Sequence, residues 1–370
     1  MKLVAESGLW TVGPDTAPTP LAAVLEVSGA VLSWTIDDPP GDERTQITFT
    51  DLSRADWLWR VFGDAGHVAL AAAADATDAV TELAGVDIVP GSIDPLRRLA
   101  VGHWLRRWWP ASQRDGIAGL DRALLDLEVA LLTAGAQDFF ADDTLDSDVT
   151  GLLVPHAAAL FTHIRSDDAR IVNLVRSGAE LADEVGVDDD AWAELIAALD
   201  DSSVVLAIPS GRRDDYALAA GADAGPRGTS IARGVASINW TAVPPAIFDA
   251  GESTVDWNVE TAGAVVRAAI VGPDLPSGIG VRLRSGAISG AGALDGEGRA
   301  LLPLLDAQGR PITESAAWDH DWTATAVIVG ADTNETRETR DRIRRWAHAR
   351  LDRPPADAFL AEILASESAY

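Results

Sequence analysis

The spacing of hydrophobic positions changes along the chain, so the sequence divides into parts with different secondary structure. Residues 1–91 mix short β-type runs with helical ones, residues 92–200 keep a period close to 3.6, and residues 201–333 return to short β-type runs. Residues 334–370 are helical again. These periods predict an α+β multidomain chain with a small mixed α/β N-terminal region, a central helical bundle, a C-terminal antiparallel β-sandwich, and an arginine-rich terminal helix and tail.

The first part combines predicted strands and helices. Strands are expected where apolar and polar residues alternate, at 21–26, 30–36 and 45–50. A helix is predicted to begin after Ser53 and to end at Gly63. Beyond it, the pattern predicts strands at 67–72 and 86–89, with a helix at 77–83 between them.

Two helices with clear boundaries open the bundle. Asp94 precedes a proline and Pro110 forbids continuation, so one helix is predicted over 95–109. Ser112 and Asp115 resemble a capping box, which predicts that the second helix begins there. Its core face is a stripe of leucines at helical spacing, namely Leu120, Leu124, Leu127 and Leu131.

Two further helices of the bundle are indicated by their N-caps. Ser166 is expected to cap a helix that Gly186 closes, and Asp188 is expected to cap a shorter one that runs through Leu199. Serine and aspartate suit these positions because their side-chain oxygens accept hydrogen bonds from first-turn amides. The middle third is therefore predicted to be a bundle of four or five helices.

Residues 201–333 hold short β-type runs separated by Gly, Pro, Asp and Ser. The runs are 204–208, 230–238, 253–260, 264–271, 280–284, 287–294, 299–305 and 323–329. Short strands with such turns predict an antiparallel sandwich. Residues 280–284 (GVRLR) and 293–304 (ALDGEGRALLPL) resemble immunoglobulin-like and transthyretin-like modules, where a strand leads into an Asp-Gly turn and a second apolar strand. The resemblance covers 244–331 and implies a fold but no chemistry, since such modules host many functions.

Composition narrows the function classes. Lys+Arg total 29 against 57 Asp+Glu, a net charge of −28, while 47% of residues are hydrophobic. The acid excess argues against nucleic acid and anionic membranes as partners, because both are polyanions. No run approaches the roughly 18 apolar residues of a membrane span. A cytoplasmic protein is expected, and the many arginines in an Ala- and Asp-rich chain are typical of a high-GC bacterial source.

No motif fixes a reaction. The chain has no cysteine, which excludes disulfides, thiolate metal sites and cysteine nucleophiles. The phosphate-binding P-loop, the Gly-x-Gly-x-x-Gly turn after a strand and the serine-hydrolase elbow Gly-x-Ser-x-Gly do not occur. We therefore expect no cofactor and no resident metal, and the sequence indicates no particular small-molecule ligand.

One short motif is the best candidate for catalysis. Asp319, His320 and Asp321 lie between two tryptophans and could supply metal ligands or a base with an orienting carboxylate. In a strand, however, alternate residues face opposite ways, so His320 would point away from both aspartates. A turn before the last strand is the favoured interpretation, and a metal-dependent or acid/base hydrolase is the alternative.

Two basic islands stand out in this acidic chain. Residues 92–122 carry a local charge of 6 − 3 = +3 and residues 337–353 one of 7 − 3 = +4, and both contain tryptophan. Arginine with tryptophan is typical of protein interfaces and of single-strand nucleic-acid platforms. The residues proposed to contact a partner are Arg106, Arg107, Arg340, Arg344, Arg345 and Trp346. Internal packing, with Arg106 and Arg107 paired to the acidic stretch 177–211, is the competing interpretation.

These features favour an interaction or scaffolding component of a bacterial cytoplasmic assembly over an enzyme. The partner is expected to be a protein, and the sequence does not identify it. A hydrolase that uses scattered Asp and His residues is the first alternative. An RNA-binding module that uses the arginine and tryptophan islands is the second, and the acid excess argues against it.

Overall fold

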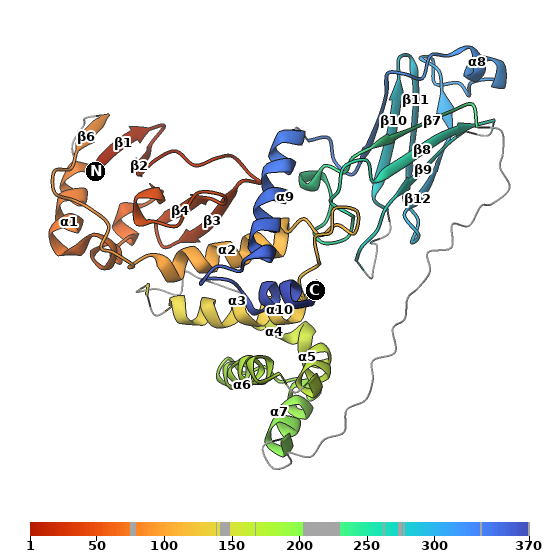
Figure 1. Ribbon diagram of the computed structural model, residues 1–370. Helices are drawn as coiled ribbons and strands as arrows, with labels where there is room; N and C mark the ends of the chain where they lie inside the picture. The colour runs from red at the N-terminus through yellow and green to blue at the C-terminus, as the bar shows by residue number, and fades with distance from the viewer. Residues whose placement is uncertain are drawn as a thin grey trace. The chain divides into compact units, whose positions relative to one another are not determined.

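The computed structural model describes residues 1–74, 79–137, 139–140, 149–166, 168–202, 230–261, 263–272, 276, 278–333 and 335–368. They form a mixed α+β fold with three antiparallel sheets, as the hydrophobic pattern predicts at this coarse level. Internal contacts divide the chain into two compact units (Figure 1). Unit 1 comprises Met1–Trp109, Leu120–Asp201 and Arg337–Tyr370, and unit 2 comprises Pro110–Gly119 and Ser202–Thr336. The division into four parts drawn from the sequence stays a prediction.

Unit 1 contains a six-stranded antiparallel sheet of order β3-β4-β5-β2-β1-β6. Its strands are β1 (Lys2–Glu6), β2 (Leu9–Val12), β3 (Ala22–Val27), β4 (Ala30–Thr35), β5 (Gln46–Phe49) and β6 (Val80–Glu82). The three predicted strands correspond to β3, β4 and β5. The β3–β4 hairpin turns at Gly29, whose φ is +67° and where a Cβ would lie 2.1 Å from the Asp51 carbonyl oxygen. Only glycine fits such a turn.

Three predictions in the first part were wrong. Residues 67–72, predicted as a strand, belong to the helix α1 (Leu58–Ala74), which kinks at Gly63. Gly66, Leu70 and Ala73 are buried on one side of α1, a helical spacing that the short alternation concealed.

The other two errors lie after α1. Within the predicted helix 77–83, residues 80–82 form β6, because pairing with β1 overrides local helix preference. Residues 86–89 form no strand, although Val89 donates from its backbone N–H to the Val61 carbonyl oxygen at 2.7 Å.

Helices make up the rest of unit 1. They are the 3₁₀ turns η1 (Asp42–Arg44), η2 (Leu52–Arg54), η3 (Val154–His156) and η4 (Ile164–Ser166), and the helices α2 (Asp94–Trp108), α3 (Arg122–Gln137), α4 (Val149–Leu153), α5 (Ala157–His163), α6 (Ala169–Glu184), α7 (Asp190–Ser202), α9 (Arg337–Asp352) and α10 (Leu360–Ser368). The predicted limits of α2 are confirmed to within a residue. Among the described residues, no helix is both long enough and apolar enough to cross a membrane.

The caps of α6 and α7 lie slightly later than predicted. Asp168 caps α6 in place of Ser166, since its carboxylate accepts a hydrogen bond from the Arg170 amide at 2.8 Å. Asp189 accepts one from the Ala191 amide at 2.8 Å at the start of α7, where Asp188 was predicted. In both helices, the residue whose carboxylate reaches a first-turn amide decides where the helix begins.

The core of unit 1 joins distant parts of the chain. Figure 1 shows α2, α3 and α10 side by side. At Gly102 of α2, a Cβ would lie 2.7 Å from Val129 of α3 and 2.8 Å from the ring of Phe359, which is fully buried just before α10. Glycine at this position therefore allows the three segments to approach closely.

Unit 2 contains two four-stranded antiparallel sheets, of order β13-β11-β10-β14 and β12-β9-β8-β7. The strands are β7 (Ala232–Ala236), β8 (Val255–Glu260), β9 (Gly263–Ala268), β10 (Gly280–Ser285), β11 (Ile288–Ala293), β12 (Arg299–Leu302), β13 (Leu304–Leu305) and β14 (Thr325–Val329), with a 3₁₀ turn η5 (Trp240–Ala242) and a helix α8 (Glu314–Asp319) that the sequence did not predict. Each described strand overlaps a predicted run. The predicted strand 204–208 lies outside the described residues.

Ser112 is not a helix cap, so the predicted capping box was wrong. Ser112 pairs with Ile117 in an isolated β-bridge, and α3 begins only at Arg122. The Ser112 hydroxyl donates to the buried carboxylate of Asp249 at 2.6 Å and accepts from the Asp115 amide at 3.0 Å. The side chain of Ser112, which the local pattern assigned to a helix cap, is therefore bound by the buried carboxylate of Asp249, 137 residues away.

Candidate functional site

The aromatic side chains of the two basic islands meet inside unit 1. Trp346 of α9 packs edge-on against Trp104 and Trp109, with ring centroids 5.0 and 6.5 Å apart. The Arg350 guanidinium lies 4.9 Å from the Trp346 ring centroid. Trp346 therefore joins α9 to the C-terminal part of α2, with cation–π and edge-to-face contacts.

The predicted partner arginines of α9 differ in exposure. Arg340 and Arg344 are each 6% exposed, and Arg344 pairs with Asp341. Arg345 is exposed and donates from Nε to the Asp341 carbonyl oxygen at 3.2 Å. In this conformation Arg345 can meet a partner, whereas Arg340 and Arg344 cannot. On the same helix, Arg342 forms an ion pair with Asp37 of the N-terminal region, with 2.7 Å between Arg342 Nη2 and Asp37 Oδ1.

The arginines at the end of α2 make contacts within unit 1. Arg106 Nε donates to Asp126 Oδ1 at 2.6 Å, and the Arg107 guanidinium lies 4.0 Å from the Trp108 ring centroid. The predicted pairing of Arg106 with the acidic stretch 177–211 was wrong, because Asp126 one helix away already satisfies that guanidinium.

Asp126 is the centre of a buried charge cluster on α3. Besides Arg106, it accepts hydrogen bonds from Arg122 Nε at 2.9 Å and binds His156 Nε2 at 3.0 Å. Burial alone would raise the pKa of Asp126, but the hydrogen bonds from His156 and Arg106 and the charge of Arg122 outweigh it and hold this pKa below its usual value. Asp126 is fully engaged, so the cluster fixes three helical segments and leaves no open acceptor for a ligand.

His103 lies on α2 next to this cluster. Its partial burial, followed by the positive charge of Arg106, lowers the pKa of His103 to about 4, although the charge of Asp126 acts in the opposite direction. His103 is therefore neutral at physiological pH.

A second buried ion pair joins α9 to α10. Arg350 donates from Nε and Nη2 to the two carboxylate oxygens of Glu362, at 2.5 and 2.7 Å. Glu362 is 0% exposed and also accepts from the Phe359 amide at 2.9 Å. A bidentate pair with an extra backbone donor is the arrangement in which a buried ion pair is well compensated.

His320 of the candidate catalytic motif belongs to a partly buried hydrogen-bond cluster. His320 Nε2 lies 2.9 Å from the Ser285 hydroxyl, and Thr325 Oγ1 donates to the same hydroxyl at 3.1 Å. The imidazole packs edge-on against Trp322, at 4.7 Å between ring centroids. A serine next to a histidine suggests a nucleophile and its base. Ser285, however, is 0% exposed, so a substrate cannot reach its hydroxyl in this conformation.

The two aspartates of this motif are occupied elsewhere. Asp319 ends α8, and Asp321 accepts hydrogen bonds from the amide and hydroxyl of Thr323, at 2.9 and 2.7 Å. Within the described part of the chain, no hydrogen bond joins either aspartate to His320. His320 and Asp321 lie in the connection between α8 and β14, as the favoured interpretation predicted.

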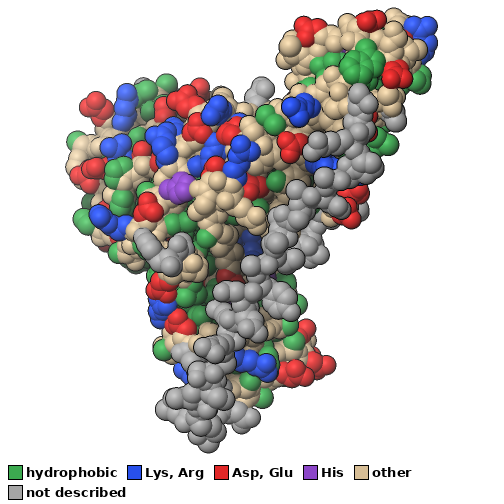
Figure 2. Space-filling model, turned by 45° about the vertical axis from the view of Figure 1, so that its right-hand side comes forward, with side chains coloured by type: hydrophobic (Ala, Val, Ile, Leu, Met, Phe, Trp, Pro, Cys, Tyr) green, Lys and Arg blue, Asp and Glu red, His purple; other side chains and the backbone are tan. Residues whose placement is uncertain are grey.

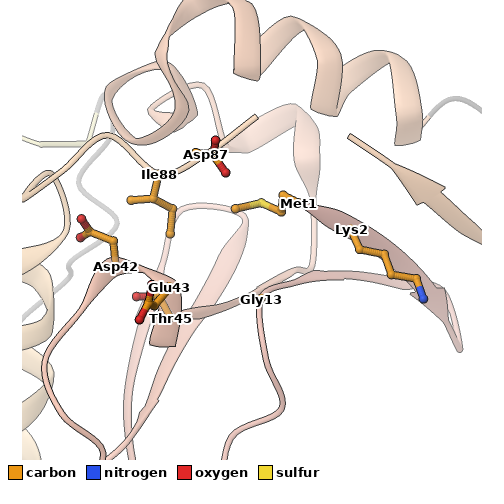
Figure 3. A pocket seen from close by; sticks show the side chains of 8 residues that line it. All are labelled: Met1, Lys2, Gly13, Asp42, Glu43, Thr45, Asp87 and Ile88. Carbon is orange, nitrogen blue, oxygen red and sulfur yellow. The ribbon is translucent and has the colours of Figure 1, made fainter. Parts of the chain in front are cut away.

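A pocket of about 500 Å³ in unit 1 is lined by several acidic residues (Figure 3). Its lining is Met1, Lys2, Gly13, Asp42, Glu43, Thr45, Asp87 and Ile88. Figure 3 shows the Met1 and Ile88 side chains at its centre, with the three carboxylates spread around them. The Asp42 carboxylate accepts from the Gly91 amide at 3.2 Å. No group of three or more His, Asp or Glu side chains in the described ranges is arranged to hold a metal ion.

The sheet β12-β9-β8-β7 presents the most unusual surface. Alternate residues of β8 and β12 are buried, and the residues between them are exposed or partly exposed, whereas in β9 only Arg267 is exposed. The exposed face carries Arg233 of β7, Arg267 of β9, Arg299 of β12, and two exposed aliphatic side chains, Val235 and Leu301, at 57% and 60% exposure. We call these five residues the arginine face.

Among the residues that the structure describes, no carboxylate forms an ion pair with the guanidinium groups of the arginine face. Arg267 lies directly opposite Arg299 in the sheet and, on its other side, opposite Asp256. No ion pair within 4 Å joins Arg233, Arg267 or Arg299 to any residue that the structure describes. Like charges directly opposite each other destabilise a sheet. The strands therefore hold unneutralised positive charge in a protein whose net charge is −28.

A groove of about 480 Å³ lies on this face. It is lined by Arg233, Gly234, Val235, Asp256, Trp257, Asn258 and Arg267, which belong to β7, β8 and β9. The visible face of unit 1 in Figure 2, by contrast, shows basic and acidic side chains interspersed. The groove therefore combines two features of a binding site, a concave shape and two convergent arginines, with the carboxylate of Asp256 on the strand between them.

Comparison with protein families, with curated proteins and with solved structures found no match to this chain.

The arginine face was missed at the level of the sequence, although its signal was present. The run 253–260 alternates apolar residues with Asp256, Asn258 and Glu260, and Arg267 is the one charged residue in the run 264–271. A single arginine in an otherwise apolar run is expected on the solvent-exposed side of its strand. Only the strand pairing reveals that Arg299 lies opposite it.

Proposed function

We propose that this protein is a non-enzymatic interaction component of a bacterial cytoplasmic assembly, and that unit 2 supplies its binding surface. In this proposal the two sheets of unit 2 pack as a β-sandwich of the immunoglobulin-like or transthyretin-like kind. Such modules commonly bind partners through the faces and edges of their sheets.

The arginine face is the observation that supports this proposal. On this face Arg267 and Arg299 lie directly opposite each other on neighbouring strands. Two exposed aliphatic side chains, Val235 and Leu301, lie on the same sheet. Arginine is enriched at protein interfaces, where its planar guanidinium binds carboxylates and its stem covers apolar surface. A negatively charged protein partner would neutralise the repulsion that the isolated sheet keeps.

The other two functions have less support. For the hydrolase, the best nucleophile is Ser285, which is fully buried. For the RNA-binding module, Arg106 pairs with Asp126, and Arg340 and Arg344 are buried, so that few of the proposed contacts are accessible.

In-cell photo-crosslinking tests this proposal. A photoactivatable residue replaces Val235 of the arginine face, and the control carries it at Ala326, an exposed position on β14 of the other sheet. We expect a defined protein to crosslink from position 235 and not from 326, and we expect Arg267→Glu to abolish this crosslink. Identical products from both positions, or an unchanged product with Arg267→Glu, would show that the arginine face is not the interface.

A further inference from the structure

Resting on the proposed function, we infer that the partner contributes an extended acidic segment, and that this segment lies in the groove with its carboxylates on Arg233 and Arg267. The groove is lined by both arginines and by Val235. The guanidinium group of arginine binds a carboxylate through two parallel hydrogen bonds. Arg233 and Arg267, which we call the two anchors, therefore favour a negatively charged ligand that runs from one to the other.

The strand register sets the spacing of the two anchors. Arg233 lies opposite Asn258, and Arg267 lies opposite Asp256, two residues further along β8 and on its other side. With a rise of about 3.4 Å per residue and a strand spacing of about 4.8 Å, the two Cα atoms are about 12 Å apart. Acidic residues two or four positions apart in an extended chain lie on one side of it and match this span, given the reach of two arginine side chains.

The apolar part of the groove favours a peptide over other anions. Val235 is 57% exposed, and it lies on β7 two residues from Arg233, in the same cross-strand row as Asp256 and Arg267. Aliphatic side chains two positions from a carboxylate lie on the same side of an extended segment, so they would cover Val235 and remove its surface from water. A small inorganic anion would leave this surface exposed.

Nucleic acid fits the groove less well. Asp256 and Asn258 lie between the arginines, and a backbone of continuous phosphates would meet the Asp256 carboxylate. No aromatic side chain is exposed on the described strands of this face for bases to stack on, since Trp257 is 6% exposed. Alternating carboxylates can avoid Asp256, whereas a uniform chain of phosphates cannot.

Direct binding to the purified full chain tests the inference. The probe is a short fluorescent peptide of repeating Glu-Ser-Val-Ser, which places Glu and Val on the same side of an extended chain, and binding is followed by fluorescence anisotropy. The control peptides replace Glu by Gln or by Lys. We expect only the Glu peptide to bind, with an affinity that falls as NaCl is raised. Arg233→Glu and Arg267→Glu should each weaken it about tenfold or more, the loss expected for one charge-assisted hydrogen bond.

The matched control is Arg284→Glu, which makes the same charge change at an exposed position of β10 on the other sheet. It should leave binding of the Glu peptide unchanged, and circular dichroism should show that all three variants are folded. Equal weakening by Arg284→Glu would reduce the effect to net charge and overturn the inference. Equal binding of the Gln peptide, or tighter binding of a single-stranded oligonucleotide, would overturn it as well.

The two experiments separate this inference from the proposed function. If position 235 crosslinks a protein that depends on Arg267 and the Glu peptide does not bind, the interaction function stands and the acidic segment is wrong. If neither experiment gives a positive result, both are wrong.

Discussion

At the scale of single residues, the nearest carboxylate decides what an arginine does in this protein. Arg106, Arg342 and Arg350 each have one within 3 Å and hold helices together. Arg233 and Arg267 have none among the described residues, and both line a groove. Arginine therefore forms internal ion pairs between helices in unit 1, whereas in unit 2 it is a candidate ligand-binding group.

His103 should make the stability of unit 1 depend on pH. The pKa of His103 is about 4 in the folded protein against an ordinary value of 6.5, so between these pH values the unfolded chain is protonated at His103 and the folded chain is not. Above about pH 6.5 this histidine has no effect on the pH dependence of stability. As the pH falls from there towards 4, the free energy of unfolding decreases, by at most about 3 kcal/mol. Chemical denaturation at a series of pH values should show a smaller loss for His103→Gln than for the wild type. Parallel curves for the two proteins would contradict this assignment.

At the scale of secondary-structure elements, Asp126 should be one of the most important charged residues for stability. Its removal by Asp126→Ala leaves Arg106, Arg122 and His156 without their shared acceptor between α2, α3 and η3. Breaking a buried ion pair from one side typically costs about 3 kcal/mol or more. Urea denaturation should show this loss.

The matched control is Glu367→Ala, which removes a carboxylate from an exposed ion pair with Arg170 at 2.7 Å. Solvent-exposed pairs contribute little, so the denaturation midpoint should barely move. A comparable loss of stability in the two variants would mean that burial does not distinguish the Asp126 cluster.

Elements with strong local signals were predictable from the sequence, and elements decided by distant pairing were not. The helix α2 follows from a proline at each end, and the strand runs of unit 2 follow from period-two alternation and turn residues. The strand β6 depends on pairing with β1, and Ser112 depends on Asp249, so local pattern alone pointed elsewhere. The candidate sites were the least predictable from the sequence, because only the tertiary structure determines whether a carboxylate lies beside a given arginine.

At the scale of the whole molecule, each compact unit is assembled from separate stretches of chain. Unit 1 joins the N-terminal sheet to the C-terminal helices, and the pair Arg342–Asp37 spans 305 positions. Unit 2 likewise receives residues 110–119, held through the hydrogen bonds of Asp249. A boundary drawn along the sequence therefore separates residues that belong to one core.

The two units should respond separately to core mutations. Phe359 of unit 1 and Leu302 of unit 2 are both 0% exposed. Phe359→Ala should cost about 3 to 5 kcal/mol and Leu302→Ala about 2 to 5 kcal/mol, the usual range for emptying large core sites. Because each residue lies in the core of a separate compact unit, each variant should destabilise mainly the unit that contains it.

Hydrogen exchange followed by mass spectrometry measures this directly. Phe359→Ala should accelerate exchange in α2, α3 and the N-terminal sheet, which surround the cavity it creates, and should leave β8 and β9 protected. Leu302→Ala should do the reverse, because Leu302 pairs with Ala264 of β9. If either variant accelerated exchange equally in both units, the chain would unfold as a single cooperative structure, and the binding surface of unit 2 would depend on the integrity of unit 1.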